Sequence, residues 1–324
     1  MVSVVRLNQF GNPDVLRVET IDRQLPEKGE AWLTQSSIGI NYLDVMQRKG
    51  LAGLLLPSGL GLEGAGVVSY LGEGVSNLSV GDRVAYALGP IGAYASERGF
   101  PAERLVKLPD TLSFDDAAAV LFKGITAQYL LKTTYPVGPG TIMLLYGVAG
   151  GVGRLMAQWA KHLGAFVIGV VSKSASVSVA ETLGCDAVLV FDPTRLSKQV
   201  AHITQGQMAD VVYDPIGRIS FEASLDALRP RGVMVSFGAS SGSPAPVEVS
   251  ILNSKGSLFL TRPSLAAHTT TVEEYQTRAN DVLNAVSAGI LTPHIAGRYA
   301  LEDVISAHRD LEAGLTSGGI ILLP

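Results

Sequence analysis

The sequence is poor in the residues that hold structural metals and disulfides. Its single cysteine, Cys185, excludes an internal disulfide and any multi-cysteine zinc site. Cys185 follows Gly184 where a helix is expected to give way to a strand, so we expect it to pack as a small hydrophobe. The histidines are few, far apart and without metal-ligand spacing: His162, His202, His268, His294 and His308. We therefore expect no metal site.

Long apolar runs and strong net charge are also missing. No apolar run approaches the roughly 20 residues of a membrane span. The start of the chain, residues 1–11, alternates like a strand and lacks the apolar core and cleavage site of a signal peptide. The formal net charge is −4 and basic residues are scattered, which argues against nucleic acid and anionic membrane as partners. We expect a soluble cytoplasmic protein.

A glycine-rich turn is the most informative feature that is present. An apolar run, Thr141–Tyr146, predicts a strand, a helical pattern follows the turn, and Ala165–Val171 predicts a second strand. The turn contains the spaced glycines Gly147, Gly150, Gly151 and Gly153. Backbone without Cβ atoms can approach a pyrophosphate closely, and amides at a helix N-terminus receive its charge. The pattern predicts a dinucleotide site, although the usual first glycine of G-x-G-x-x-G is Val148, and a tight turn without a ligand is the alternative.

The end of the second strand indicates which dinucleotide binds. An NAD site usually has Asp or Glu about 20 residues after the glycines, to bind the ribose hydroxyls. Here the strand runs into Ser172, Lys173 and Ser174, and the next carboxylate is Glu181. A lysine favours a 2′-phosphate that a carboxylate would repel, so we expect NADPH. The alternative is that Lys173 is only a solvated surface residue.

The pattern of elements changes along the chain. The first 120 residues read mainly as strands and turns, with helices expected at Tyr42–Lys49 and Phe114–Phe122. From about Lys123, helices and six candidate strands alternate, which predicts a doubly wound parallel sheet. After Pro263 the pattern is mainly helical, and we expect a terminal strand, Gly319–Leu323, to return to the first domain. The predicted fold is α/β, with a nucleotide domain at 123–264 inserted into a largely β catalytic domain of residues 1–122 and 265–324.

The order of these motifs resembles the medium-chain dehydrogenase/reductase superfamily, in particular its zinc-independent NADPH:quinone oxidoreductases, relatives of zeta-crystallin. The resemblance covers nearly the whole chain and includes the segments 39–44, 57–64, 81–84, 123–126, 149–153, 212–214, 234–238 and 261–265. It implies that the β domain is GroES-like and that the inserted parallel sheet is a Rossmann domain. It also implies a homodimer formed through the sheet edge of the nucleotide domain.

The resemblance also implies chemistry without a metal. Zinc alcohol dehydrogenases have a histidine near the position of Leu62 and a cysteine near that of Asn41. Zinc polarises a carbonyl, so its loss favours acceptors whose reduced forms are already delocalised, such as quinones and other conjugated carbonyls. The implied reaction is hydride transfer from nicotinamide C4 to a quinone in the interdomain cleft, with protonation from solvent and catalysis by positioning.

Site residues follow from the same resemblance. The implied catalytic residues are Asn41, Tyr42, Thr126 and Arg262. The implied cofactor contacts begin with Asn41 and Thr126 at the nicotinamide ribose, and with Gly150, Gly151, Val152 and Gly153 at the pyrophosphate. They continue with Ser172, Lys173, Ser176 and Phe191 around the adenosine phosphate, Gly217 on the adenosine side, and Phe237, Gly238, Ser240 and Ser264 at the nicotinamide end.

Several residues have a structural alternative. Asn41 and Asp44 can cap the helix that begins at Tyr42, and Tyr42 itself can be a core aromatic. Arg262 can be a surface ion-pair partner, and we interpret Glu63 as structural. Each of these alternatives stays open on the sequence.

The chain also departs from the family pattern. Ala52 stands where relatives often have a tyrosine considered for substrate contact or proton delivery, and Gly314 where they have a phosphate-directed arginine. Two rival functions therefore stay open beside quinone reduction. One is reduction of the carbon–carbon double bond of enones or alkenals, and the other is a non-catalytic NADPH-binding protein, structural or RNA-binding.

Overall fold

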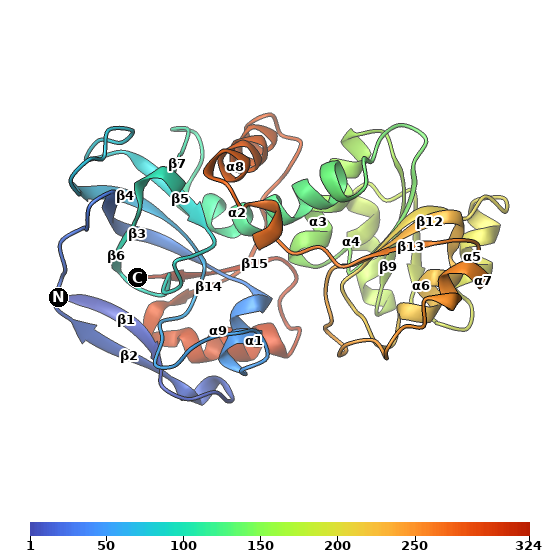
Figure 1. Cartoon of the computed structure of the whole chain (residues 1–324), viewed down its shortest axis with the longest axis horizontal. Coiled ribbons are helices and arrows are strands. Elements are labelled where there is room, and N and C mark those ends of the chain that lie inside the picture. Colours follow the sequence, from blue (N-terminus) through green and yellow to red (C-terminus); the bar gives the residue numbers. More distant parts are fainter. The chain divides into compact units, whose positions relative to one another are not determined.

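The computed structural model describes residues 1–324 and divides the chain into two compact units (Figure 1). The first comprises Met1–Ile125 together with Thr269–Pro324, and the second comprises Thr126–His268. The sequence predicts domain boundaries after residues 122 and 264, and these boundaries stay a prediction. No helix combines the length and apolar character that a membrane crossing requires.

Strands dominate the first unit. Its larger sheet has the order β14-β15-β3-β4-β5-β7, and β6 also pairs with β3. These strands are β3 (Glu30–Ile40), β4 (Glu63–Leu71), β5 (Arg83–Ala87), β6 (Glu97–Pro101), β7 (Val106–Lys107), β14 (Ile295–Ala300) and β15 (Gly319–Leu323). A separate antiparallel hairpin joins β1 (Val2–Leu7) to β2 (Leu16–Ile21). Because β15 pairs with β3, the expected return of the terminal strand is confirmed.

The helices of the first unit are α1 (Tyr42–Arg48), the start of α2 (Phe114–Tyr129), α8 (Val272–Ser287) and α9 (Val304–Glu312). Figure 1 shows α1 beside α9, and the two helices are in contact. Successive side chains along each strand point to opposite faces of the sheet. The side chains that point inward form one core, which includes Leu33, Tyr86 and Ile320.

Helix α2 differs from the sequence prediction. Ser113 caps it as expected, since its Oγ accepts from the backbone N–H of Asp116 at 3.0 Å. The helix was expected to end at Phe122 but continues to Tyr129, through Gly124. A Cβ at Gly124 would lie 2.5 Å from Cγ1 of Val282 on α8. The glycine therefore serves close helix packing and does not end the helix.

The second unit is the doubly wound sheet that the sequence predicts. Its six strands are all parallel and follow the order β10-β9-β8-β11-β12-β13. They are β8 (Ile142–Tyr146), β9 (Phe166–Val171), β10 (Ala187–Val190), β11 (Ala209–Asp214), β12 (Leu228–Ser236) and β13 (Phe259–Thr261). A short π-helix, Leu130–Thr134, continues directly from α2. The helices that follow are α3 (Gly151–His162), α4 (Val177–Thr182), α5 (Leu196–Ile203), α6 (Phe221–Asp226) and α7 (Ser250–Ser254).

The strand order places the sheet's reversal at β8. The chain moves outward from β8 to β9 and β10, then returns to β11 on the other side of β8. In open parallel sheets, ligands bind beyond the carboxyl ends of the strands at such a reversal. The loops that follow β8, β9, β11 and β12 are therefore the ones to consider for a site.

Candidate functional site

The turn after β8 leaves its backbone open for a ligand. Gly147 has φ +63°, and Gly150 is the N-cap of α3. A Cβ at Gly153 would lie 2.2 Å from the carbonyl oxygen of Gly147, so only glycine allows the first turn of α3 to pack on this loop. The amides of Gly151, Val152 and Gly153 have no intrahelical acceptor, as at any helix start. The turn therefore provides the cradle of amides that a pyrophosphate requires.

Val148 explains the departure from the usual glycine spacing. Its side chain is fully buried and its Cγ1 would be 3.2 Å from a Cβ added at Gly169 on β9. The residue thus points into the sheet and fills space that Gly169 leaves. The valine side chain therefore does not lie over the amides of Gly150, Gly151 or Gly153.

The predicted 2′-phosphate residues follow β9 and β10. Ser172 and Lys173 are exposed directly after β9, and the N–H of Ser176 donates to the carbonyl of Lys173 at 3.0 Å. Phe191 follows β10 and its ring makes an edge contact with Tyr146 at the end of β8, with centroids 5.6 Å apart. These residues lie at the carboxyl end of neighbouring strands, as a site for the adenosine end of a dinucleotide would require.

The loops after β11 and β12 are tied together around a buried carboxylate. Asp214 accepts hydrogen bonds at 2.6–3.1 Å from the N–H groups of Ile216 and Gly217 and the hydroxyls of Ser220 and Ser224. Ser240 N–H then donates to the carbonyl of Pro215 at 3.1 Å. From the sequence, Asp214 was expected only as part of the family segment 212–214. The signal that could have identified it is an Asp that ends a strand before Pro-Ile-Gly.

This loop pair brings together predicted cofactor residues of both the nicotinamide end and the adenosine side. The N–H of Phe237 donates to the carbonyl of Asp214 at 3.0 Å, and a Cβ at Gly238 would lie 2.6 Å from the carbonyl oxygen of Pro215. Gly217 has φ +92°, and a Cβ there would lie 2.6 Å from the carbonyl oxygen of Gly242. Both glycines are therefore required for the close approach of the two loops.

Arg262 and Ser264 follow β13. The Arg262 guanidinium donates from Nη1 to Ser236 Oγ at 3.3 Å and to the carbonyl of Gly238 at 3.4 Å. The structure thus places Arg262 at the end of β12 and not in the surface ion pair considered as its alternative. Ser264 Oγ accepts from the N–H of Ala267 at 3.3 Å, which caps a short turn.

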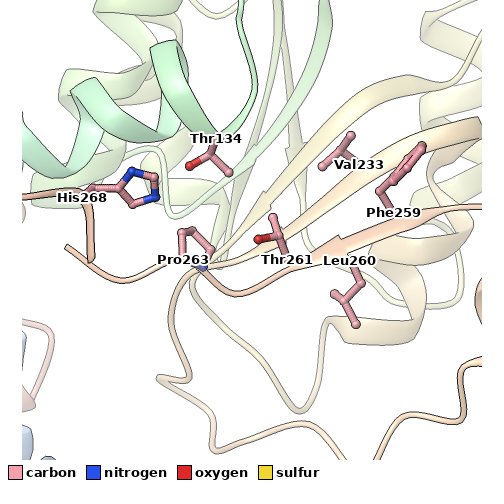
Figure 2. Close-up of a pocket in the computed structure, with 7 residues that line it drawn as sticks. All are labelled: Thr134, Val233, Phe259, Leu260, Thr261, Pro263 and His268. Carbon is pink, nitrogen blue, oxygen red and sulfur yellow. The ribbon is translucent and has the colours of Figure 1, made fainter. Parts of the chain in front are cut away.

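A pocket of about 400 Å³ lies elsewhere in the second unit, along its edge strand β13. Figure 2 shows His268 and Thr134 at one end of it and Phe259 near the other. The His268 ring stacks on Tyr129 with centroids 4.3 Å apart. None of the predicted site residues lines this pocket, so it is separate from the glycine turn.

In the first unit, the side chain of Asn41 contacts a buried ion pair. Asn41 follows β3, is only 4% exposed, and donates from Nδ2 to Glu63 Oε2 at 2.9 Å. The other oxygen of Glu63 accepts from the N–H of Phe122 at 2.7 Å. Lys123 Nζ lies 3.4 Å from Glu63 Oε2 and donates to the carbonyl of Ile40 at 3.2 Å. Burial raises the pKa of the Glu63 carboxyl, and Lys123 opposes that rise.

The remaining predicted residues near this cluster have different environments. Asn41 caps α1 and forms a capping box with Asp44, whose Oδ2 accepts from the Asn41 N–H at 2.9 Å. Tyr42 is 44% exposed, which contradicts its alternative as a core aromatic. Thr126 lies on α2 one turn after Lys123 and is buried.

A chain of buried, hydrogen-bonded side chains that no sequence motif indicated extends from Asp44. Tyr94 O–H donates to Asp44 Oδ2 at 2.8 Å, and His308 Nε2 lies 3.1 Å from the same hydroxyl. His308 Nδ1 lies 3.2 Å from Arg48 Nη1. Arginine only donates, so Nδ1 accepts and the ring proton sits on Nε2. Every bond of the chain therefore runs in one direction, from Arg48 to Asp44.

Burial controls both titratable ends of this chain. It raises the pKa of the Asp44 carboxyl to about 7, although the Asn41 N–H and Tyr94 O–H favour the charged form. Burial, together with the positive charge of Arg48, lowers the pKa of His308 to about 3. Beyond His308, the Arg48 guanidinium also pairs with Glu312.

The fold and these sites define a dehydrogenase/reductase built from a GroES-like unit and a Rossmann unit. The model described as alcohol dehydrogenase GroES-like domain matches residues 27–110, and that described as zinc-binding dehydrogenase matches residues 151–284. Although the second description mentions zinc, no group of three or more His, Cys, Asp or Glu side chains in the structure could hold a metal ion.

Relatives match over the full length. A quinone oxidoreductase from Pseudomonas aeruginosa is 40% identical over 325 residues, covering 100% of both chains. The 2-haloacrylate reductase of a Burkholderia species is 39% identical, covering 100% of this chain and 99% of the relative. The structure of Escherichia coli quinone oxidoreductase complexed with NADPH superposes with a TM-score of 0.95 at 40% identity, covering 99% of this chain and 100% of that one. The chain belongs to the quinone oxidoreductase family of the medium-chain dehydrogenase/reductase superfamily.

Proposed function

We propose that this protein is an NADPH-dependent quinone reductase. The observation that carries the proposal is the turn at Gly147–Gly153, which opens a cradle of amides at the reversal of a parallel sheet. Relatives of 40% identity named quinone oxidoreductase, one of them solved with NADPH, support the cofactor and the acceptor. The residues of the second unit fit NADPH, since the glycine turn presents backbone amides at the start of α3 and an exposed lysine follows β9.

In this proposal the second unit holds most of the cofactor. Gly150, Gly151, Val152 and Gly153 bind the pyrophosphate through backbone amides. Ser172, Lys173 and Ser176 bind the 2′-phosphate, because a lysine and two hydroxyls match its charge and its acceptor oxygens. Phe191 and Gly217 border the adenosine, and Phe237, Gly238, Ser240 and Ser264 border the nicotinamide.

The chain's own contribution to the reaction is positioning and charge. NADPH supplies a hydride from nicotinamide C4, which a quinone accepts together with a proton from solvent. Asn41 and Thr126 orient the nicotinamide ribose, and the exposed Tyr42 ring contacts the acceptor. The Arg262 guanidinium, beside Ser236 and Gly238, stabilises the negative charge that develops on the reduced acceptor. No step requires a metal in this proposal.

Reduction of an activated carbon–carbon double bond is the second candidate. The 39% identity to 2-haloacrylate reductase supports it, because that relative is named for an alkene substrate. Purified protein should be assayed for NADPH oxidation with naphthoquinone, ortho-quinones, short enones and 2-haloacrylate. Turnover of quinones alone supports our proposal, and turnover of alkenes alone replaces it. Tight NADPH binding without turnover of any acceptor, together with retention of RNA, supports the non-catalytic alternative.

We also propose a homodimer that forms through β13. This strand is at the edge of its sheet, and its Phe259 is 61% exposed beside the pocket of Figure 2. An unpaired edge with an exposed aromatic residue favours pairing with a second copy. Phe259→Lys should shift the mass measured by light scattering from dimer to monomer, whereas the control Val249→Lys, at another exposed apolar residue, should not. A monomeric wild-type protein would refute this part.

A cytoplasmic location is part of the same proposal, and cell fractionation tests it.

A further inference from the structure

The buried pair Glu63 and Lys123 has no role in the reaction proposed above, yet it contacts a proposed cofactor residue. Glu63 is completely buried and Lys123 is 7% exposed. A buried ion pair rarely increases stability over apolar residues of similar size, so its presence asks for another explanation. The side chain that the pair holds is the amide of Asn41.

The contacts of Glu63 determine which way that amide faces. Phe122 N–H donates to Oε1 at 2.7 Å, and Lys123, which has only donors, lies 3.4 Å from Oε2. Both oxygens of Glu63 are therefore acceptors. The Asn41 atom 2.9 Å from Oε2 must then be the NH₂ group, and Oδ1 faces away from Glu63.

The backbone of Asn41 is fixed as well. Its N–H donates to Asp44 Oδ2 at 2.9 Å, and Asp44 is held in turn by Tyr94. With its backbone held in this way, Asn41 has one amide orientation that satisfies Glu63 in the wild-type protein. A carbonyl oxygen has two lone pairs, so Oδ1 can accept a hydrogen bond from a ligand in addition to capping α1.

We propose that Glu63 and Lys123 are positioning residues that hold the Asn41 NH₂ group on Glu63, so that the Asn41 carbonyl oxygen is the atom left to accept from a ligand. Asn41 thereby acts as an acceptor for a hydroxyl donor, which matches the ribose next to the nicotinamide. The proposal rests on the proposed function, because it assigns an atom to a contact that the function assumes. It also changes the interpretation of Glu63 from structural to functional.

The test uses exchanges that keep the shape of the side chains. In Glu63→Gln the Phe122 N–H keeps Oε1 as its acceptor, so an NH₂ group faces the Asn41 amide. The Asn41 amide must then reverse and present a donor to the cofactor. We expect NADPH to bind about tenfold more weakly, the effect of one lost hydrogen bond, by fluorescence titration. Glu97→Gln is the matched control, since Glu97 accepts from Trp32 Nε1 at 2.8 Å in the same unit.

Two double variants separate this role from a general loss of structure. In the Asn41→Ala background, Glu63→Gln should weaken NADPH binding by less than about twofold, because the two residues act as one unit. In Asn41→Asp/Glu63→Gln a carboxylate oxygen again faces the cofactor, so affinity should return to within about threefold of wild type. Equal losses in both backgrounds, or no recovery in the double variant, would overturn the proposal.

A measurement on the unaltered protein covers the case in which Glu63→Gln does not fold. The side-chain amide protons of Asn41, assigned by their loss in Asn41→Asp, should stay protected from exchange when NADPH binds. Loss of that protection on NADPH binding would mean that the amide leaves Glu63, and the proposal would fail. If the wild-type protein does not bind NADPH at all, the proposed function itself fails, which is a different result from either outcome.

Discussion

The two units build their parts of the proposed site from different materials. In the second unit the cradle is backbone, made by amides and missing Cβ atoms between Gly147 and Gly153. In the first unit the candidate residues are side chains held by other side chains, with Glu63 between Asn41 and Lys123. The first kind of site leaves no space for a Cβ at Gly153, and the second kind requires every buried donor to have an acceptor.

This difference has a physical consequence for each kind of residue. A cradle of backbone amides can bind any ligand that contains a pyrophosphate, because every non-proline residue has the same N–H donor. A side chain in a buried network has one orientation, set by which partners donate and which accept. We therefore expect substitutions in the glycine turn of the second unit to weaken cofactor binding by steric overlap. Substitutions around Asn41 in the first unit should weaken it by placing a donor where an acceptor is needed.

The largest expected effect comes from adding one carbon to the cradle. Gly153→Ala places a Cβ 2.2 Å from the carbonyl oxygen of Gly147, so the loop and α3 must separate. Overpacking of this kind costs about 1–3 kcal/mol, so NADPH affinity should fall up to about a hundredfold by fluorescence titration. Gly138→Ala is the matched control, because nothing lies within 4 Å of a Cβ there. Equal NADPH affinity of the two variants would mean that the turn does not hold the cofactor.

The same contrast explains how much the sequence could predict. The sheet of the second unit and the turn at Gly147–Gly153 were predictable, because apolar runs and glycine spacing are local signals. The terminal strand was predictable for the same reason. The orientation of Asn41 was not, since its partners Glu63 and Lys123 are 22 and 82 residues further along the chain.

Two further features also depend on contacts distant in sequence. Gly124 was expected near a helix end, but α8, more than a hundred residues later, packs on it. His308 showed no ligand spacing, and only the fold places it beside Tyr94 and Arg48. The roles of such residues can be recognised only in the folded structure, because they depend on burial and on neighbours that no local sequence pattern specifies.

The second prediction concerns a side chain in the unit whose site is otherwise backbone. Lys173→Glu removes a positive charge and adds a negative one where we propose the 2′-phosphate binds. KM for NADPH should rise about tenfold or more, while KM for NADH stays within about twofold, because only NADPH has that phosphate. Lys198→Glu, at an exposed lysine of the same unit, controls for the change in net charge. Equal effects on both cofactors would show that Lys173 does not recognise the phosphate.

The buried chain of the first unit links two groups with opposite pH dependence. The pKa of Asp44 is raised from 3.8 to about 7, so the folded state retains a proton that the unfolded chain releases. Its contribution to stability is complete below pH 3.8 and is lost as pH rises through about 7. The pKa of His308 is lowered from 6.5 to about 3, so its contribution is present above pH 6.5 and lost as pH falls through about 3. Between pH 6.5 and 8 the Asp44 contribution is being lost, while the His308 contribution still gains about 0.4 kcal/mol as the imidazole of the unfolded chain loses its remaining protons.

The smallest expected effect follows from this separation. Between pH 6.5 and 8 the ionisation of Asp44 in the folded state should lower the free energy of unfolding by about 0.8 kcal/mol, and deprotonation of His308 in the unfolded chain should offset about 0.4 kcal/mol of that loss. Asp44→Asn keeps the shape of the neutral carboxyl and cannot ionise, so its unfolding free energy should no longer fall over this range. Urea unfolding at several pH values measures both curves, and Asp110→Asn, at an exposed carboxylate, should retain the wild-type slope. A slope that is unchanged in Asp44→Asn would show that Asp44 is already ionised at pH 6.5, and that the chain from Arg48 ends on a charge.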